Sequence, residues 1–130
     1  MFRREALVAA GPFDERLGLG AGDGPWESGE EIDLLIRALR TGARIAYDPE
    51  LVVEHPVREL DDARRRVLAR RDGASVGYLL RKHGYGARTT ARMLARPVGG
   101  MGLSLLHGDR AAARLQLETL RGRVAGLRGA

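Results

Sequence analysis

The chain has 130 residues, no cysteine and a formal net charge of +5. This length suits one domain with a modest core, and the hydrophobic share of 44% argues against wholesale disorder. The lack of cysteine excludes disulfides and thiolate metal sites, and no apolar run reaches the roughly 20 residues that span a bilayer.

The first part of the chain predicts a short helix followed by a loop. Residues 3–10 predict a helix that ends at Gly11, which is followed by proline. Residues 16–29 contain five glycines and predict a loop, which either approaches a ligand or is an ordinary connection. Trp26 in this loop either stacks on a sugar face or anchors the loop on the core. Asp14 either caps the turn that follows it or lines a substrate cleft.

An amphipathic helix is predicted over residues 29–41. Its apolar residues recur at the helical spacing i, i+3, i+4, i+7, which indicates one buried stripe. These residues are Ile32, Leu35, Ile36 and Leu39. Gly42 is a natural stop. Residues 43–47 and 51–54 then predict two short strands, joined by a turn over residues 48–50.

Three acidic residues crowd the start of this helix. Glu30, Glu31 and Asp33 can raise one another's pKa values, so that one of them serves as a general base. The alternative is structural. Ser28 and Glu31 fit a capping box, and Asp33 with Arg37 fits an ion pair across one helical turn.

The rest of the chain predicts helices. One covers residues 60–83 with a break near Gly73, and shorter helical segments cover residues 87–95 and 103–106. Asp109 is expected to cap a last helix that reaches about residue 127. The two histidines of this part, His83 and His107, are interpreted as surface or helix-end residues, since neither has a partner at metal-ligand spacing.

Charge divides the chain into two parts. Residues 1–57 contain six arginines and eleven acidic residues, a net charge of −5, whereas residues 58–130 contain sixteen basic and six acidic residues, a net charge of +10. The basic part suits anionic lipid, nucleic acid or a nucleotide-linked substrate, or is a solvated arginine-rich face. Aromatic residues make up only 5%, so we expect no specific nucleic-acid partner.

Five sequence motifs follow one another along the chain: FRRE, GPFDE, SGEEIDLLIRAL, GARIAYDP and VVEH. Together they resemble the C-terminal, acceptor-side part of bacterial family 2 glycosyltransferases of the GT-A type. The consensus motifs of that family are close to GGFDE, GEDxDLxxR and PxxxVxH. The resemblance covers about residues 2–56. It implies an α+β fold, with a partial acceptor-side subdomain over residues 1–57 that includes the two strands. A mostly helical extension over residues 58–130 follows.

The resemblance also implies roles for individual residues. Glu31 stands where the family has the base that deprotonates the acceptor hydroxyl, and His55 stands where a histidine helps to hold the metal and diphosphate. Judged by itself, His55 ends an extended run and either binds metal or phosphate or bonds to nearby backbone. The residues expected to bind or frame the substrate are Asp14, Trp26, Glu30, Asp33 and Arg37.

Two departures from the family pattern shape the functional expectation. The base position holds Glu rather than the commoner Asp, and no DxD motif occurs in the sequence. The expected reaction is inverting transfer from a nucleotide sugar to a cell-envelope glycan or lipid-linked acceptor, with Mn²⁺ or Mg²⁺. This chain would lack the donor-binding half, be inactive alone, and lie in the cytoplasm or at the inner face of the cell membrane. The alternative is a non-catalytic basic helical module that binds anionic membrane or a partner protein.

Overall fold

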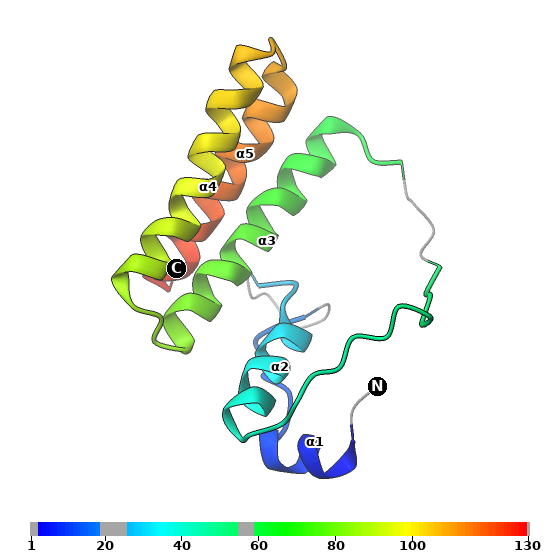
Figure 1. Cartoon of the computed structure of the whole chain (residues 1–130). Helices are drawn as coiled ribbons and strands as arrows, with labels where there is room; N and C mark the ends of the chain where they lie inside the picture. The colour runs from blue at the N-terminus through cyan, green and yellow to red at the C-terminus, as the bar shows by residue number, and fades with distance from the viewer. Residues whose placement is uncertain (1–2, 19–25, 55–58, 130) are drawn as a thin grey trace.

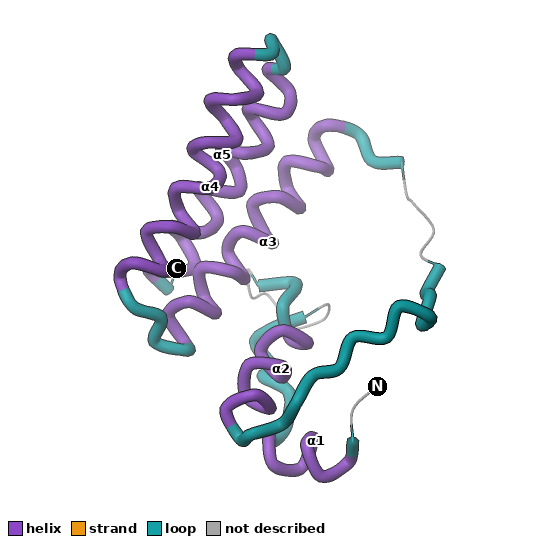
Figure 2. The backbone as a smooth tube through the Cα atoms, in the orientation of Figure 1, coloured by secondary structure: helices purple, strands orange, loops and turns teal. Residues whose placement is uncertain are grey.

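The computed structural model describes residues 3–18, 26–54 and 59–129. Across these residues all regular secondary structure is helical (Figures 1 and 2). The helices are α1 Arg4–Ala10, α2 Glu30–Arg40, α3 Asp62–Lys82, α4 Ala87–Leu106 and α5 Arg110–Arg128. The two short helices lie together at one end of the molecule, and α4 and α5 form a long hairpin that reaches the other end (Figure 1).

The predicted α+β fold is wrong, because the two expected strands do not form. Residues 43–47 and 51–54 follow an extended path and pair with no strand in the described part of the chain (Figure 2). A run of apolar residues favours a strand, but a strand also needs a neighbour for its backbone N–H and C=O groups. The apolar side chains of this segment are therefore exposed, namely Ile45, Tyr47, Leu51, Val52 and Val53. The predicted turn between them is confirmed, since the N–H of Leu51 donates to the carbonyl oxygen of Asp48 at 3.3 Å.

Helices α1 and α2 confirm two predictions but bury a different face from the one expected. Ile32 and Leu39 are about half exposed, whereas Leu34 and Ala38 are buried against Ala10 of α1. The predicted capping box is also wrong. Gly29 is the N-cap of α2 with φ +95°, and the Ser28 hydroxyl donates instead to Asp72 of α3 at 2.9 Å.

The predicted break at Gly73 is wrong, since α3 is continuous. Gly73 and Gly77 face α5, while Gly122 and Gly126 of α5 face α3, so the two backbones approach closely. A Cβ atom added at any of the four would overlap a backbone carbonyl oxygen of the other helix. The glycines are therefore packing surfaces inside helices rather than helix ends.

Helix α4 is also continuous, although two shorter segments were expected. It contains Pro97, which is buried and has no N–H to donate to the carbonyl of Met93 one turn earlier. The Arg123 side chain of α5 donates to that carbonyl instead. This bond from α5 gives the Met93 carbonyl the donor that Pro97 lacks, and the helix continues to Leu106. Asp109 caps α5 as predicted, since its carboxylate accepts from the N–H of Ala112 at 2.9 Å.

A second apolar cluster lies where α3 meets the loops of the first part. Tyr78 and Leu79 of α3 are buried with Leu17, and Trp26 packs against them. None of the helices in residues 3–18, 26–54 and 59–129 is both long and apolar enough to cross a membrane.

Candidate functional site

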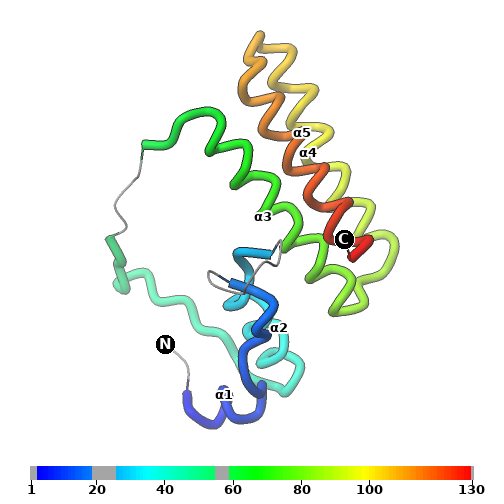
Figure 3. The backbone as a smooth tube through the Cα atoms, turned by 180° about the vertical axis from the view of Figure 1, so that it is seen from behind, coloured from blue at the N-terminus to red at the C-terminus, as the bar shows by residue number. Residues whose placement is uncertain are grey.

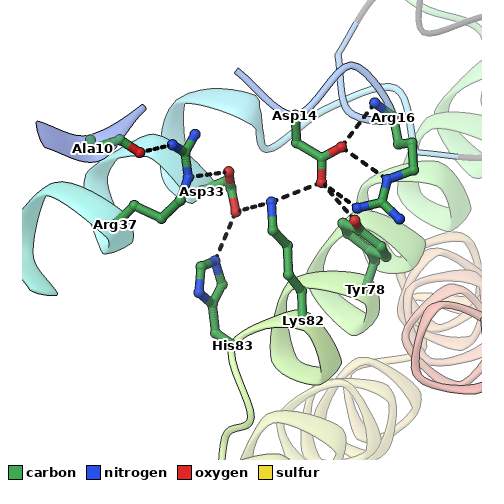
Figure 4. Close-up of polar contacts among 8 residues, drawn as sticks. All are labelled: Ala10, Asp14, Arg16, Asp33, Arg37, Tyr78, Lys82 and His83. Atoms are coloured by element: carbon green, nitrogen blue, oxygen red, sulfur yellow. Dashed lines mark hydrogen bonds and ion pairs between the residues drawn. The ribbon is translucent and has the colours of Figure 1, made fainter. Parts of the chain in front are cut away.

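Asp33 of α2 is the centre of a buried charge network (Figure 4). Its side chain is fully buried and accepts three bonds from basic groups. Arg37 Nε lies 2.8 Å from one carboxylate oxygen, and Lys82 Nζ at 2.6 Å and His83 Nε2 at 2.8 Å share the other. The predicted ion pair between Asp33 and Arg37 is thereby confirmed.

Asp14 is the second carboxylate of the network. Lys82 Nζ lies 2.8 Å from it and so bridges the two acids. The Tyr78 hydroxyl donates to Asp14 at 2.6 Å. Arg16 donates from its backbone N–H and from its guanidinium, at 3.0–3.1 Å. The network therefore joins the loop after α1, helix α2 and the last turns of α3.

Local sequence explains how each side chain reaches this point. Tyr78 and Lys82 are four residues apart and share one face of α3. Two arginines of α2 bind the free carbonyls at the ends of other helices. Arg37 donates to Ala10 at the end of α1, and Arg40 donates at 2.7 Å to the carbonyl of His83, the C-cap of α3. A cation at a helix C-terminus is favoured by the helix dipole, so α2 binds both neighbouring helix ends.

The network fixes the ionisation of its members. Burial alone would raise the pKa of Asp33, but hydrogen bonds from Lys82 and Arg37 outweigh it and lower that pKa. The pKa of Asp14 is also lowered, because bonds from Arg16, Lys82 and Tyr78 outweigh the effect of burial. Burial, followed by the bond to Asp14, raises the pKa of Tyr78 to about 12.

The surroundings of His83 favour its neutral form. Burial lowers the pKa of its ring, and the charges of Arg40 and Lys82 act in the same direction, while Asp33 opposes them. Lys82 and Arg37 already balance the charge of Asp33, so burial has the larger effect on the pKa of His83. A neutral ring whose Nε2–H donates to Asp33 satisfies the geometry at 2.8 Å.

This network does not suit a divalent cation. Within the described residues, no group of three histidine or acidic side chains is arranged to hold a metal. Lys82 also lies within 3 Å of both carboxylates, which places a positive charge where a metal would bind. The predicted metal ligand His55 lies outside the described residues, and its role stays a prediction.

The remaining predicted site residues lie near the network but not in it. Glu31 is exposed in the first turn of α2. The Glu30 carboxylate packs on Gly18, and one of its oxygens is buried with no hydrogen-bond partner in the described part of the chain. Trp26 stacks on Tyr78 with ring centroids 4.3 Å apart, which fits the interpretation of this residue as a loop anchor. Sugar stacking by its other face stays a prediction.

Four members of the network were missed from sequence: Arg16, Tyr78, Lys82 and His83. His83 is interpreted from the sequence as a surface or helix-end residue. It is a helix-end residue, the C-cap of α3, but it is not on the surface, because its side chain is 3% exposed. The basic pair Lys82–His83 at the end of α3 was the available signal. Its acidic partner lies about 50 residues earlier, which no local spacing rule can find.

Comparison of the chain with family models, curated proteins and solved structures finds no match.

Proposed function

We propose that this chain forms the acceptor side of a glycosyltransferase that uses a nucleotide-sugar donor. The acceptor is a cell-envelope glycan or a lipid-linked glycan, and Glu31 is the general base. The sequence contains no DxD motif, and the network around Asp33 does not suit a metal. The proposal therefore assigns binding of the donor diphosphate and its divalent metal to a part of the enzyme beyond the printed sequence.

One observation carries the proposal. Asp14 of the upstream motif and both Asp33 and Arg37 of the α2 motif meet in one network, which Lys82 bridges. Two sequence stretches that the resemblance linked are thus brought together in space. The same network holds α2 by buried contacts on one side, while Glu31 at its start stays exposed.

The chemistry favours Glu31 over its neighbour Asp33 as the base. A general base must reach the hydroxyl proton and have a lone pair free to accept it. Three basic groups surround the Asp33 carboxylate, and no solvent reaches it, so it serves as an anchor. Glu31 is exposed and lies outside the buried face of α2. In the proposed step its carboxylate takes the acceptor proton, the acceptor oxygen bonds to the anomeric carbon, and the bond to the diphosphate breaks with inversion.

Binding measurements on the isolated chain test the acceptor assignment. We expect short cell-envelope oligosaccharides or polyprenyl-phosphate-linked sugars to perturb the backbone NMR signals of residues 26–33. Nucleotide sugars with Mn²⁺ should leave them unchanged. Glu5→Gln, in the exposed first turn of α1, is a matched control for Glu31→Gln. Perturbations spread evenly over the chain, or none with any acceptor, would contradict the proposal.

Turnover tests the role of Glu31. In enzyme assembled with its donor-binding part, Glu31→Gln should lower kcat by about 100-fold or more, because general-base catalysis contributes on that order. The melting temperature should stay unchanged, and Glu5→Gln should keep full activity. An active Glu31→Gln enzyme would show that the base is another residue. Transfer by the printed chain alone would show that the donor site was assigned wrongly.

A further inference from the structure

The outward face of α4 carries an unbroken basic stripe. Arg88, Arg92 and Arg96 recur every four residues and are all exposed. At about 100° per residue, this spacing keeps them within roughly 80° of one another around the helix. Residues 87–106 contain no acidic side chain, so nothing within the helix neutralises the stripe.

Helix α4 becomes apolar toward its end, partly on the line of the arginines and partly beside it. Residues 97–106 carry no charge, yet four large apolar side chains among them are about half exposed or more. These are Val98 at 47%, Leu103 at 59%, Leu105 at 55% and Leu106 at 85%. Leu103 and Leu106 continue the line of the arginines. Single exposed apolar residues are normal on a protein surface, but a run of this kind marks an interaction site.

The apolar part lies at a free end of the molecule. The turn between α4 and α5 is far from α1 and α2 in both views (Figures 1 and 3). Beyond the turn, Arg110 and Arg114 of α5 are also exposed. Basic residues therefore border the apolar part on both sides. The acid nearest to it in the sequence, Asp109, is engaged in capping α5.

We propose that the outward face of α4, together with the first turn of α5, docks on an anionic lipid membrane. We call it the α4 surface. Arginines bind lipid phosphates, and the leucines at the tip enter the boundary between headgroups and acyl chains. Helix α4 lies in the plane of the interface and does not cross it, as its three arginines require. The proposal does not depend on Glu31 or on glycosyl transfer.

Charge and exposure together decide between the possible occupants. Nucleic acid would bind the arginines but offers no apolar environment to side chains exposed as much as Leu106. A second copy of this face would bring two sets of arginines together without acids between them. An anionic bilayer satisfies the arginines and the leucines at once.

Co-sedimentation of the whole chain with lipid vesicles tests the proposal. We expect binding to vesicles that contain about a third phosphatidylglycerol and little binding to pure phosphatidylcholine. Replacing Arg88, Arg92 and Arg96 by Gln should weaken partitioning roughly 100-fold, because about 1 kcal/mol per charge corresponds to about a fivefold change for each arginine. The control with equal charge loss is Arg3→Gln, Arg4→Gln and Arg44→Gln. These residues are exposed in the α1–α2 end of the molecule, and their loss should weaken binding far less.

A second measurement separates insertion from electrostatic adsorption. The sequence has no cysteine, so Leu106→Cys accepts a single environment-sensitive dye. We expect a blue shift of its emission with anionic vesicles. A dye at Val53→Cys, also exposed and apolar, should stay unshifted. Leu103→Ser with Leu106→Ser should weaken binding about tenfold or more, and Leu51→Ser with Val53→Ser should not.

Three results would overturn the proposal. Equal binding of the two triple arginine variants would show that only net charge matters. An unshifted dye at residue 106 on bound protein would show that the leucines stay in water. Binding to a random RNA duplex that exceeds binding to anionic vesicles at the same salt concentration would assign the surface to nucleic acid instead.

Discussion

The two sides of α3 face neighbours that hold it by different forces. On the side of α1 and α2, buried charges join the elements: Asp33 and Asp14 both bind Lys82. The apolar cluster of Tyr78 and Leu79 with the preceding loops lies on the same side. On the side of α5, backbone meets backbone at four glycines, and an ion pair between Arg70 and Glu118 at 3.6 Å also joins the two helices. The contact with α1 and α2 depends on the ionisation of Asp14, Asp33 and Lys82. The contact with α5 depends mainly on the small volume of the four glycines. Changes of charge should therefore destabilise α1 and α2 with their loops, which we call the first region. Changes of side-chain size should destabilise the packing of α3 on α5, which we call the second region.

The largest effect is expected from Asp33→Asn. This change leaves Lys82 and Arg37 partly buried without their shared anion, and breaking a buried ion pair costs about 3–5 kcal/mol. Urea unfolding with hydrogen exchange should show the loss mainly in α1 and α2, with α3–α5 still protected. Glu31→Gln is the control and should change stability by less than about 0.5 kcal/mol, because Glu31 is exposed. Equal loss of protection in α5 would contradict the division into two regions.

Gly126→Ala tests the second region. The added methyl group overlaps the carbonyl oxygen of Ala74, so α3 and α5 must separate. Overpacking of this kind costs about 1–3 kcal/mol, which exceeds the gain of about 1 kcal/mol in helix propensity. Gly102→Ala is matched, because nothing lies within 4 Å of its added Cβ. It should raise the melting temperature slightly. If both variants were stabilised, the close approach of α3 and α5 would be wrong.

Acid should weaken the first region before the second, in two steps. The lowered pKa of His83 means that the unfolded chain takes up this proton first, so stability falls as the pH drops below about 6.5. Asp14 and Asp33 also have lowered pKa values, and their contribution is lost as the pH drops below about 4. The slope is at most about 1.4 kcal/mol per pH unit for each proton, so the step that involves both Asp14 and Asp33 can be twice as steep as the His83 step.

Thermal melts from pH 8 to pH 3 measure these two steps. In His83→Gln the step near pH 6 should be absent while the step below pH 4 remains. At alkaline pH the raised pKa of Tyr78, about 12, predicts a loss of stability above pH 10, where the unfolded chain ionises first. A flat profile between pH 8 and pH 5 in the unmodified chain would contradict the neutral state of His83.

The smallest effect is expected from Arg71→Gln. This change removes an exposed ion pair with Glu27, at 2.5 Å, that also joins the first region to α3. Exposed pairs contribute about 0–1 kcal/mol and weaken with salt. Arg65→Gln, exposed on the same helix, is the control. A loss as large as that of Asp33→Asn would mean that burial is not what makes the central network strong.

Sequence reasoning succeeded where the deciding signal was local. Apolar spacing and stop residues predicted α1 and α2, and Asp109 predicted the start of α5. The Asp33–Arg37 pair followed from spacing on one helix. Each of these depends on residues at most a few positions apart, so the sequence alone contains the information.

The failures all involve a partner far away along the chain. A strand depends on a neighbouring strand, and residues 43–47 have none in the described ranges. Gly73 breaks an isolated helix but joins two packed helices, and only the position of α5 distinguishes these outcomes. Lys82 has no acidic partner nearby in sequence, because Asp14 and Asp33 lie 68 and 49 positions earlier.

One turn of α3 takes part in both kinds of contact. Gly77 lies against the backbone of α5, and its neighbour Tyr78 donates to Asp14 on the other side. A shift of α5 therefore moves the Tyr78 hydroxyl, and loss of the Asp14 bond frees the turn that α5 packs against. We expect the two contacts to be coupled through these two residues, so a change in the packing of α5 on Gly77 should also change the strength of the Asp14–Tyr78 bond.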